Sequence, residues 1–95
     1  MIEVNVQKDS ISVIGHAGYA PPGQDIVCSA VTTHVQALAA SIDNLTDDTP
    51  DYTIAPGVFI LKIKDLSEKS RTLVDSFFIG ICGIVDAYPD YVRIV

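Results

Sequence analysis

The sequence predicts an α+β fold with the element order ββαββαβ, in which two helices pack on one mainly antiparallel sheet. Three observations lead to this prediction: short segments of alternating apolar and polar residues, two longer segments whose apolar residues recur every three or four positions, and breaks that contain Gly or Pro. With 48 % hydrophobic and 19 % charged residues, the chain of 95 residues has the composition of a folded protein. We therefore expect residues 1–95 to form a single domain.

The first half of the chain is predicted to form a β-hairpin, a loop and a long helix. Residues 1–7 and 11–15 alternate around a short polar turn, which is typical of a hairpin with one buried face. Two glycines and two prolines within residues 16–24 predict a loop. Asp25 stands where a helix N-cap is needed, because its carboxylate can accept backbone N–H groups of the first turn. The helix, beginning near Ile26, carries one apolar stripe made of Cys28, Val31, Val35, Leu38, Ile42 and Leu45.

A second hairpin is predicted after this helix. Residues 46–51 end the helix, since proline and short polar side chains favour a turn over further helical bonds. Residues 52–54 and 58–64 are rich in β-branched and aromatic side chains, and they flank an Ala-Pro-Gly turn at residues 55–57.

A second helix and a last strand complete the predicted fold. Asp65 can begin the helix as part of a capping box with Glu68, and Ser67 is an equally suitable cap. The helix must end before Pro89. Residues 91–95 alternate again and predict the final strand.

Charge and composition exclude several classes of function. Twelve Asp and Glu residues against six Lys and Arg residues give a net charge of −6, the wrong sign for coating a nucleic acid backbone. The longest apolar run, residues 77–85, has nine residues, whereas a transmembrane helix needs about 20. Residues 1–15 lack the features of a signal peptide, so we expect a soluble cytoplasmic protein that binds no membrane. Two cysteines and two histidines are too few and too scattered for a zinc site, and we expect no metal ion and no cofactor.

Residues 15–32 contain the side chains best suited to chemistry. If Asp25 is the N-cap, Cys28 lies in the first helical turn, where unpaired N–H groups and the positive end of the helix dipole stabilise a thiolate. His16, on the preceding loop, could pair with that thiolate as an imidazolium and later protonate a leaving amine. The same N–H groups could hold a carbonyl oxyanion. This combination is that of a cysteine hydrolase.

The same residues also allow structural interpretations, which the pattern alone leaves open. Cys28 is in register with the apolar stripe, and free cysteine is among the most buried residue types. His16 could be a hydrogen-bonded loop residue, and Asp25 is most simply a cap. Two other functions therefore remain: a non-catalytic dimeric module that binds a peptide on a free strand edge with Cys28 buried, and a redox-sensing thiol. Rapid alkylation of Cys28 at neutral pH would favour the hydrolase over the binding module.

Two runs of residues stand in close succession: Gly15-His16-Ala17-Gly18-Tyr19-Ala20 and Gly23-Gln24-Asp25-Ile26-Val27-Cys28-Ser29-Ala30-Val31-Thr32. Together they resemble the signature of the ribosomal-processing cysteine protease family (Prp), which has Gly-His-Ala, a Tyr-Ala pair, Gly-x-Asp-Ile-Val-Cys and Ala-Ala-Val-Ser. This chain departs from the pattern at Ser29 and Thr32, which replace Ala and Ser. The resemblance is close over residues 15–32 and loose over the whole chain.

This resemblance implies a small bacterial endopeptidase that removes a short N-terminal extension from a large-subunit ribosomal protein, the twenty-seventh. The family cuts after an aromatic-rich segment, so the expected substrate is the ribosomal protein precursor. Carried over by position, Cys28 is the nucleophile and His16 the catalytic base. The family is also typically homodimeric.

Other residues of the motif are expected to support the dyad. Gly15 belongs to the signature. Asp25 either orients His16 or only caps the helix, and the cap is the favoured interpretation. The Thr32 hydroxyl could bond near the site, but a bond back to the Cys28 carbonyl is the favoured prediction. Residues 17–24 are predicted to form a lid over the substrate, with hinges at Gly18 and Gly23 and with Tyr19 in contact with the aromatic segment. These last three residues are the predicted substrate-binding loop.

Outside the motif, the sequence predicts structural roles. His34 should point away from Cys28 and lie on the surface, because six residues correspond to about 240° around a helix. Cys82 lies within the apolar run and is interpreted as a core thiol. Gly80 and Gly83 are predicted to allow close helix packing. The run is too apolar for one sheet face to cover, which indicates a subunit interface.

Overall fold

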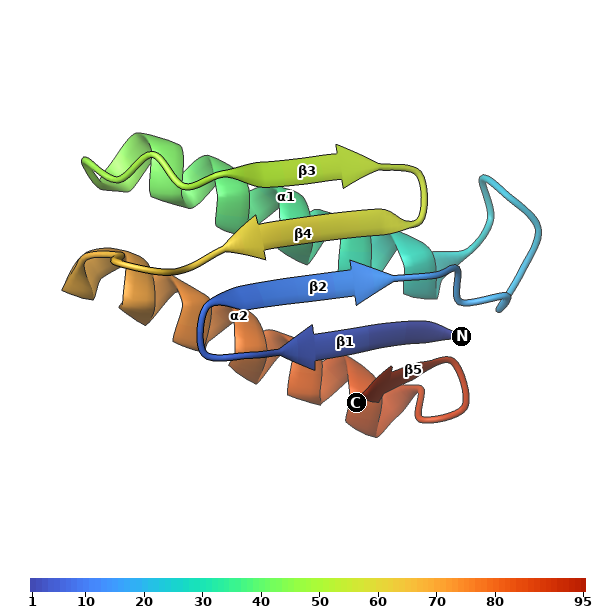
Figure 1. The fold of residues 1–95 in the computed structure, drawn as a ribbon. Coiled ribbons are helices and arrows are strands. Elements are labelled where there is room, and N and C mark those ends of the chain that lie inside the picture. The colour runs from blue at the N-terminus through green and yellow to red at the C-terminus, as the bar shows by residue number, and fades with distance from the viewer.

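Five strands form one sheet, and both helices lie on the same face of it (Figure 1). The computed structural model describes residues 1–95. The elements follow one another as β1 (Ile2–Val6), β2 (Ser10–Ile14), α1 (Ile26–Leu45), β3 (Tyr52–Ala55), β4 (Val58–Lys62), α2 (Glu68–Ala87) and β5 (Val92–Ile94). The predicted α+β class and the order ββαββαβ are therefore confirmed.

The sheet has the strand order β3-β4-β2-β1-β5. Its hairpins account for the antiparallel pairs β1–β2 and β3–β4, and β2 joins them by pairing antiparallel with β4. Only β5 runs parallel to its neighbour, β1. β4 runs in the same direction as β5, and α2 supplies the long crossover that connects these two strands. The sheet is mainly antiparallel, as predicted.

One cluster of buried apolar side chains lies between the sheet and the helices. Alternate residues of β1, β2 and β4 contribute to it, as their period of two predicts. The buried stripe of α1 is rotated relative to the predicted one, because Val27 is fully buried and Cys28 only half-buried. One residue corresponds to about 100° around a helix, so Cys28 lies at the edge of the stripe. The prediction for Leu45 is wrong: this last helical residue is 62 % exposed.

By length and hydropathy alone, α1 could also cross a membrane. A spanning helix is apolar around its whole circumference, whereas this one exposes Ser29, Thr33 and Gln36. Its apolar side is covered by the rest of the protein, and the buried residues are Val27, Val31, Val35, Leu38, Ala39 and Ile42. In this fold α1 is therefore the core helix beneath the sheet.

Ser67 caps the start of α2, and its hydroxyl accepts the backbone N–H of Ser70. The alternative cap, Asp65, lies outside the helix in a left-handed conformation with φ 60°. The buried stripe of α2 consists of Ser70, Val74, Phe77 and Ile81. Cys82 follows Ile81 and is turned about 100° away from it, which leaves the thiol half-buried. The prediction of a core thiol is wrong, because a continuous apolar run does not reveal which side of a helix faces the core.

The two helices approach each other closely beside His34. Its ring lies edge-on to Phe77, with the ring centroids 6.5 Å apart. A Cβ on Gly80 would lie 2.5 Å from His34 Nε2, so Gly80 allows close packing as predicted. His34 is consequently half-buried between the helices and not on the free surface as predicted. A Cβ on Gly83 would meet nothing within 4 Å. The prediction that Gly83 allows close packing between the two helices of one chain is therefore wrong.

A polar cluster joins the loop after α1 to the start of α2. Asp48 Oδ2 accepts hydrogen bonds from the backbone and hydroxyl of Ser67 and from the hydroxyl of Ser70. These donors, with the Ser67 hydroxyl foremost, lower the pKa of Asp48 below its ordinary value. Ser70 is fully buried, and its pairing with Asp48 satisfies the hydroxyl in the core.

Candidate active site

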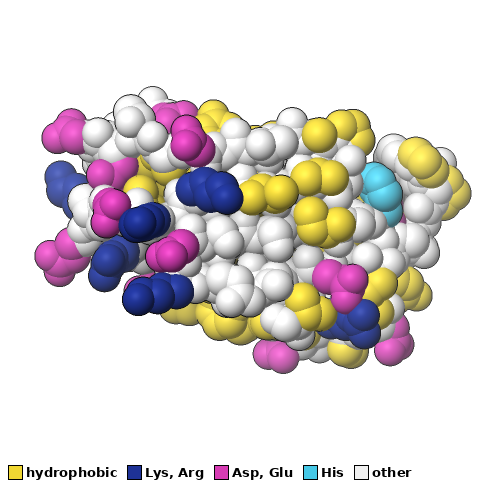
Figure 2. Space-filling view, viewed as in Figure 1, with side chains coloured by type: hydrophobic (Ala, Val, Ile, Leu, Met, Phe, Trp, Pro, Cys, Tyr) yellow, Lys and Arg dark blue, Asp and Glu magenta, His cyan; other side chains and the backbone are white.

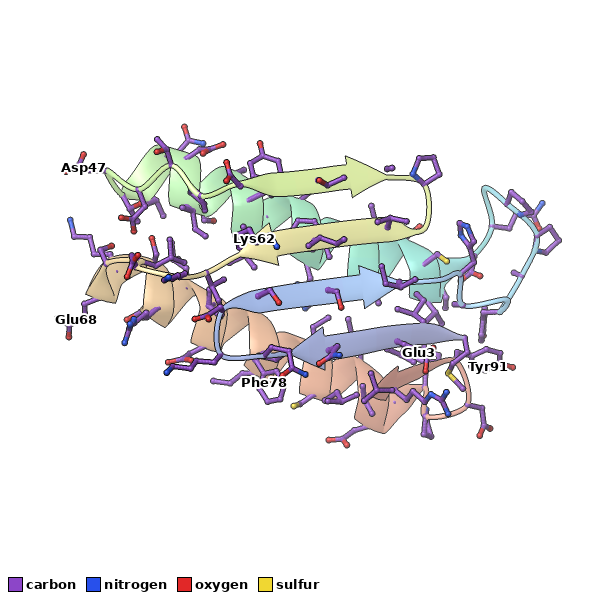
Figure 3. All side chains as sticks on the ribbon, viewed as in Figure 1. Glu3, Asp47, Lys62, Glu68, Phe78 and Tyr91 are labelled. Atoms are coloured by element: carbon purple, nitrogen blue, oxygen red, sulfur yellow. The ribbon has the colours of Figure 1, made fainter.

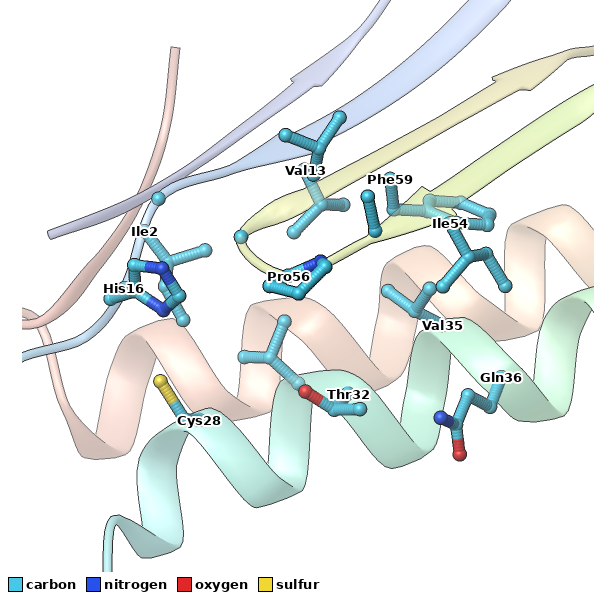
Figure 4. A pocket seen from close by; sticks show the side chains of 15 residues that line it. Ile2, Val13, His16, Cys28, Thr32, Val35, Gln36, Ile54, Pro56 and Phe59 are labelled. Carbon is cyan, nitrogen blue, oxygen red and sulfur yellow. The ribbon is translucent and has the colours of Figure 1, made fainter. Parts of the chain in front are cut away.

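His16 and Cys28 come together at one end of the sheet (Figure 4). His16 follows β2, and Cys28 lies in the first turn of α1. Both line a cleft of about 240 Å³ whose other wall includes residues 54–57, the end of β3 and the turn into β4. In Figure 4 the Cys28 sulfur points toward the His16 ring. The fold thus places the two predicted partners in one cleft.

The Cys28 sulfur accepts a hydrogen bond from the backbone N–H of Ala17, with 3.2 Å between N and Sγ. This contact fixes the sulfur beside the loop that carries His16. The backbone N–H of Cys28 itself donates to Asp25 Oδ1 at 2.9 Å. The Cys28 N–H is therefore bound to the helix cap, and an oxyanion held by other N–H groups of this turn stays a prediction. The Cys28 thiol is half-buried and lines the cleft. The alternative of a binding module required a buried Cys28, which the structure does not show.

Asp25 caps α1, as predicted, and also holds the preceding loop. Besides the Cys28 N–H, its carboxylate accepts the backbone N–H groups of Tyr19 at 3.0 Å and Ala20 at 3.4 Å. The Cys28 N–H is the main cause of a lowered pKa of Asp25; the two loop N–H groups add to it and burial partly offsets it. One buried carboxylate therefore positions both the helix start and the loop.

Asp25→Asn is expected to reduce the acid sensitivity of the fold. A carboxyl group whose pKa is lowered by folding stabilises the protein fully above its unfolded pKa, about 3.9, and loses that contribution as the pH falls through the folded value. Urea unfolding at pH 7, 5 and 3 should show a smaller loss of stability on acidification for the variant. Asp51→Asn, at an exposed position, is the matched control. Equal pH dependence of wild type and Asp25→Asn would contradict this role of Asp25.

The 17–24 loop makes further contacts with its own chain through Tyr19. This ring packs edge-on against Tyr88 and Tyr91, at centroid distances of 5.6 and 5.1 Å, and Figure 3 shows Tyr91 at the loop end of the molecule. Tyr19 keeps 42 % of its surface exposed. It thus has an anchoring role that the sequence did not predict, while its contact with a substrate stays a prediction.

Glycine is required at both predicted hinges of the loop. Gly18 and Gly23 have φ values of 69° and 84°, in the left-handed region that other residues rarely adopt. Gly15 has φ 109°, and a Cβ there would collide with the carbonyl oxygen of Met1. Its backbone N–H donates to the Gly57 carbonyl at 2.8 Å. Gly15 therefore holds the end of β2 close to both β1 and the β3–β4 turn, which is a supporting role.

Thr32 lies one helical turn after Cys28 and faces the cleft (Figure 4). Its hydroxyl does not donate to the Cys28 carbonyl, although Thr46 and Thr72 make such back-bonds to Ile42 and Glu68. The back-bonding prediction is therefore wrong. The Thr32 side chain instead takes part in the wall of the cleft.

His16, Cys28 and Thr32 separate two hollows. One is largely apolar and lies between α1 and the β3–β4 turn. The other lies beneath the loop and is mainly lined by small and polar residues, including Gly18, Gly23 and Asp25. A peptide bound across the Cys28 thiol would have one side of its scissile bond in the apolar hollow and the other side in the polar hollow.

Sequence reasoning missed one whole wall of this cleft. The apolar hollow is lined by β3, β4 and their turn, among them Ile54, Pro56 and Phe59. These residues were predicted only as a hairpin, because their separation from Cys28 along the chain gives no sign of proximity. The Ala17 N–H was also missed, since backbone groups leave no trace in side-chain patterns.

The family model described as "Cysteine protease Prp" matches residues 1–93 of the sequence. This chain belongs to the cysteine protease Prp family. The resemblance seen at residues 15–32 is thereby confirmed and extended over almost the whole chain. As a Prp family member, the protein is a cysteine protease.

Relatives and solved structures agree with this membership. The ribosomal processing cysteine protease Prp of Mycoplasma genitalium is 23 % identical over 94 residues, covering 99 % of this chain and 94 % of the relative. A crystal structure of Staphylococcus aureus Prp with a covalently linked product peptide superposes with a TM-score of 0.87 at 19 % identity, covering 98 % of this chain and 94 % of that one. A Streptococcus mutans protein superposes with a TM-score of 0.79 at 26 % identity, covering 98 % and 89 %. The two superpositions show that this chain shares its fold with the Staphylococcus aureus and Streptococcus mutans proteins.

Proposed function

We propose that this Prp family member is an endopeptidase that removes the N-terminal extension of a large-subunit ribosomal protein, the twenty-seventh, with Cys28 as nucleophile and His16 as acid and base. Support for the substrate class comes from the Mycoplasma genitalium relative, which is named a ribosomal processing protease, and from Staphylococcus aureus Prp, which was crystallised with a substrate peptide. The enzyme would act in the cytoplasm on the ribosomal protein precursor. Residues 1–95 would make up its single catalytic domain.

The chemistry proceeds through a thioester. The Cys28 thiolate attacks the carbonyl carbon of the scissile peptide bond, and the resulting tetrahedral adduct collapses when the His16 imidazolium protonates the leaving amine. The C-terminal product departs with a new amino terminus, while the extension remains bound to sulfur. His16 then takes one proton from water, whose oxygen attacks the thioester and expels the thiolate. The extension is released as a carboxylic acid, which loses its proton to the solvent. The thiolate and the imidazolium are regenerated at the end of this cycle.

The observation that carries the proposal is the shared cleft. The Cys28 thiol and the His16 ring face the same hollow, and the Ala17 N–H donates to the sulfur at 3.2 Å. Asp25 is committed to backbone N–H groups and is left out of the dyad, so its role is to fix the helix start and the loop. Two side chains, aided by one backbone donor, form the proposed catalytic group.

The surface around the cleft suits an apolar substrate segment. Figure 2 shows the charged side chains on this face mostly gathered at the end opposite the 17–24 loop, while apolar side chains prevail toward the loop. The labelled Asp47, Lys62 and Glu68 lie at that charged end in Figure 3. An aromatic-rich segment would fill the apolar hollow, and the net charge of −6 would steer a basic ribosomal protein toward the enzyme.

The test is to incubate the purified protein with a peptide copying the N-terminal segment of its host's ribosomal protein. Mass spectrometry should detect one cut that follows the aromatic segment. A peptide with the same composition in scrambled order is the control and should stay intact. An intact native peptide after long incubation with correctly folded enzyme would overturn the assignment of the substrate.

The proposal includes a homodimer formed through the exposed side of α2. Ile79 is 73 % exposed in the middle of this helix, and Cys82 and Gly83 follow at offsets of three and four residues on the same face. A Cβ on Gly83 would meet nothing within 4 Å, which leaves room for a second backbone to approach. Half-buried Phe78 precedes Ile79 in α2, and Figure 3 shows it below β1 in that view. A second copy of the chain would cover this apolar surface.

Ile79→Asp is expected to convert the dimer into a monomer, because an aspartate would be buried without a partner in the interface. Light scattering after size-exclusion chromatography gives the mass directly. Leu45→Asp is the matched control, since Leu45 is 62 % exposed on α1, and it should remain dimeric. A wild-type protein that is monomeric at every concentration tested, or an Ile79→Asp protein that remains dimeric, would contradict this interface.

A further inference from the structure

We propose that Gly57, in the turn between β3 and β4, is a positioning residue for the His16 imidazole. This inference rests on the proposed role of His16 in catalysis. It adds a residue that is distant from the motif in sequence and that has no side chain with which to react. Gly57 acts by leaving the space that the ring occupies.

The contact between the two residues is close. A Cβ built on Gly57 would lie 2.7 Å from His16 Nε2, 3.1 Å from Cε1 and 3.4 Å from Cδ2. Contacts below 3.0 Å are essentially never made by a real Cβ atom, so one of the two residues would have to move. The Gly57 backbone has φ 71° and belongs to a turn tied into the sheet, whereas the imidazole is an exposed side chain. The ring is therefore the group that would be displaced.

The position of His16 depends on packing. The hydrogen bonds around the site involve Ala17, Asp25 and Cys28, and the imidazole takes part in none of them. The backbone next to His16 is fixed to the same turn, because the Gly15 N–H donates to the Gly57 carbonyl at 2.8 Å. Gly57 thus positions both the backbone next to His16 and the His16 ring. The ring lies beside the Cys28 sulfur (Figure 4).

The same turn also forms a wall of the substrate cleft. Residues 54–57 line the apolar hollow together with residues of α1, and Figure 4 shows Pro56 facing the hollow above α1. A peptide seated in this hollow would contact the wall that positions His16. Occupation of the cleft and alignment of the dyad are therefore linked through the turn.

Other glycines in left-handed conformations lack this feature. Gly18 and Gly23 also have positive φ values, yet a Cβ at either residue would meet nothing within 4 Å. Alanine at Gly23 therefore introduces the backbone strain alone, while alanine at Gly57 introduces the strain and the contact with His16. The difference between these two variants isolates the contact.

The experiment compares Gly57→Ala, His16→Ala and the double variant. Displacing a catalytic group by about 1 Å can slow a reaction about 10²-fold, so Gly57→Ala should lower kcat by about that factor with little change in KM. The pH profile for alkylation of Cys28 by iodoacetamide should move toward that of His16→Ala. Once His16 is absent, Gly57→Ala should have no further effect on either quantity. In unfolding experiments, Gly57→Ala should lower the free energy of unfolding more than Gly23→Ala does. In the His16→Ala background, the effect of Gly57→Ala should fall to about the size of the Gly23→Ala effect.

A wild-type kcat for Gly57→Ala would overturn the inference. An equal loss of kcat from Gly57→Ala in the presence and in the absence of His16 would also overturn it, because it would indicate a structural role only. If Gly57→Ala does not fold, Gly57→Asn provides the same Cβ in a residue that tolerates positive φ. Wild-type cleavage by His16→Ala would overturn the proposed dyad. The alkylation profiles and unfolding measurements would in that case still decide whether Gly57 positions the ring.

Discussion

Replacing Cys28 with alanine is expected to abolish peptide cleavage while leaving the fold nearly unchanged. The variant lacks the sulfur that forms the thioester, and loss of a nucleophile can cost about 10⁴-fold or more in rate. The side chain is half-buried at the edge of the α1 stripe, and alanine is small and favours helix. Cleavage is measured by mass spectrometry of the peptide products, and folding by circular dichroism and thermal unfolding. Cleavage by Cys28→Ala at the wild-type rate would contradict the assignment of Cys28 as the nucleophile.

Cys82→Ser is the matched control, because it alters the other free thiol of the chain. Cys82 is half-buried on α2 and lines neither hollow of the cleft. A serine there should retain full activity with little loss of stability. An inactive but correctly folded Cys82→Ser protein would show that the wrong cysteine had been identified.

His16→Ala is expected to lower the cleavage rate by about 10²- to 10⁴-fold, the usual contribution of a general acid or base. A histidine beside a cysteine sulfur activates it as a nucleophile, so alkylation of Cys28 at pH 7 should be slower in the variant. The Ala17 N–H still donates to the sulfur, and some reactivity should therefore remain.

Alkylation of Cys28 with iodoacetamide, followed by peptide mapping, separates the two cysteines. His34→Ala serves as the control for loss of a histidine, since His34 packs against Phe77 and Gly80 between the helices. It should lower stability and leave the alkylation rate of Cys28 in place. An unchanged alkylation rate in His16→Ala would mean that His16 does not activate the Cys28 sulfur.

The elements of the fold could be predicted because each has a local signal. Asp25 and Ser67 mark the helix starts, and the alternation in β1 and β2 shows which side of the sheet is buried. The exact rotation of a helix has no such signal when apolar residues crowd its surface. Cys82 and Leu45 were therefore assigned to the core, although both lie outside it.

The site was predictable where its residues are neighbours in sequence. His16, Asp25 and Cys28 lie within one short segment, so their chemistry and their motif could be recognised together. Gly57 could not be identified in this way, because its contact with His16 arises from the pairing of β2 with β4. The Tyr19 anchor likewise depends on residues after α2, which α2 and β5 bring back to the loop.

The most direct test of the account is to find the atom that carries the peptide during catalysis. Enzyme and substrate peptide are mixed, quenched in acid within the first turnover and digested for mass spectrometry. The account predicts a thioester between the N-terminal extension and Cys28, and it predicts that the adduct is absent from Cys28→Ala. An adduct on Cys82, or complete cleavage with no adduct on Cys28 at any time point, would contradict it.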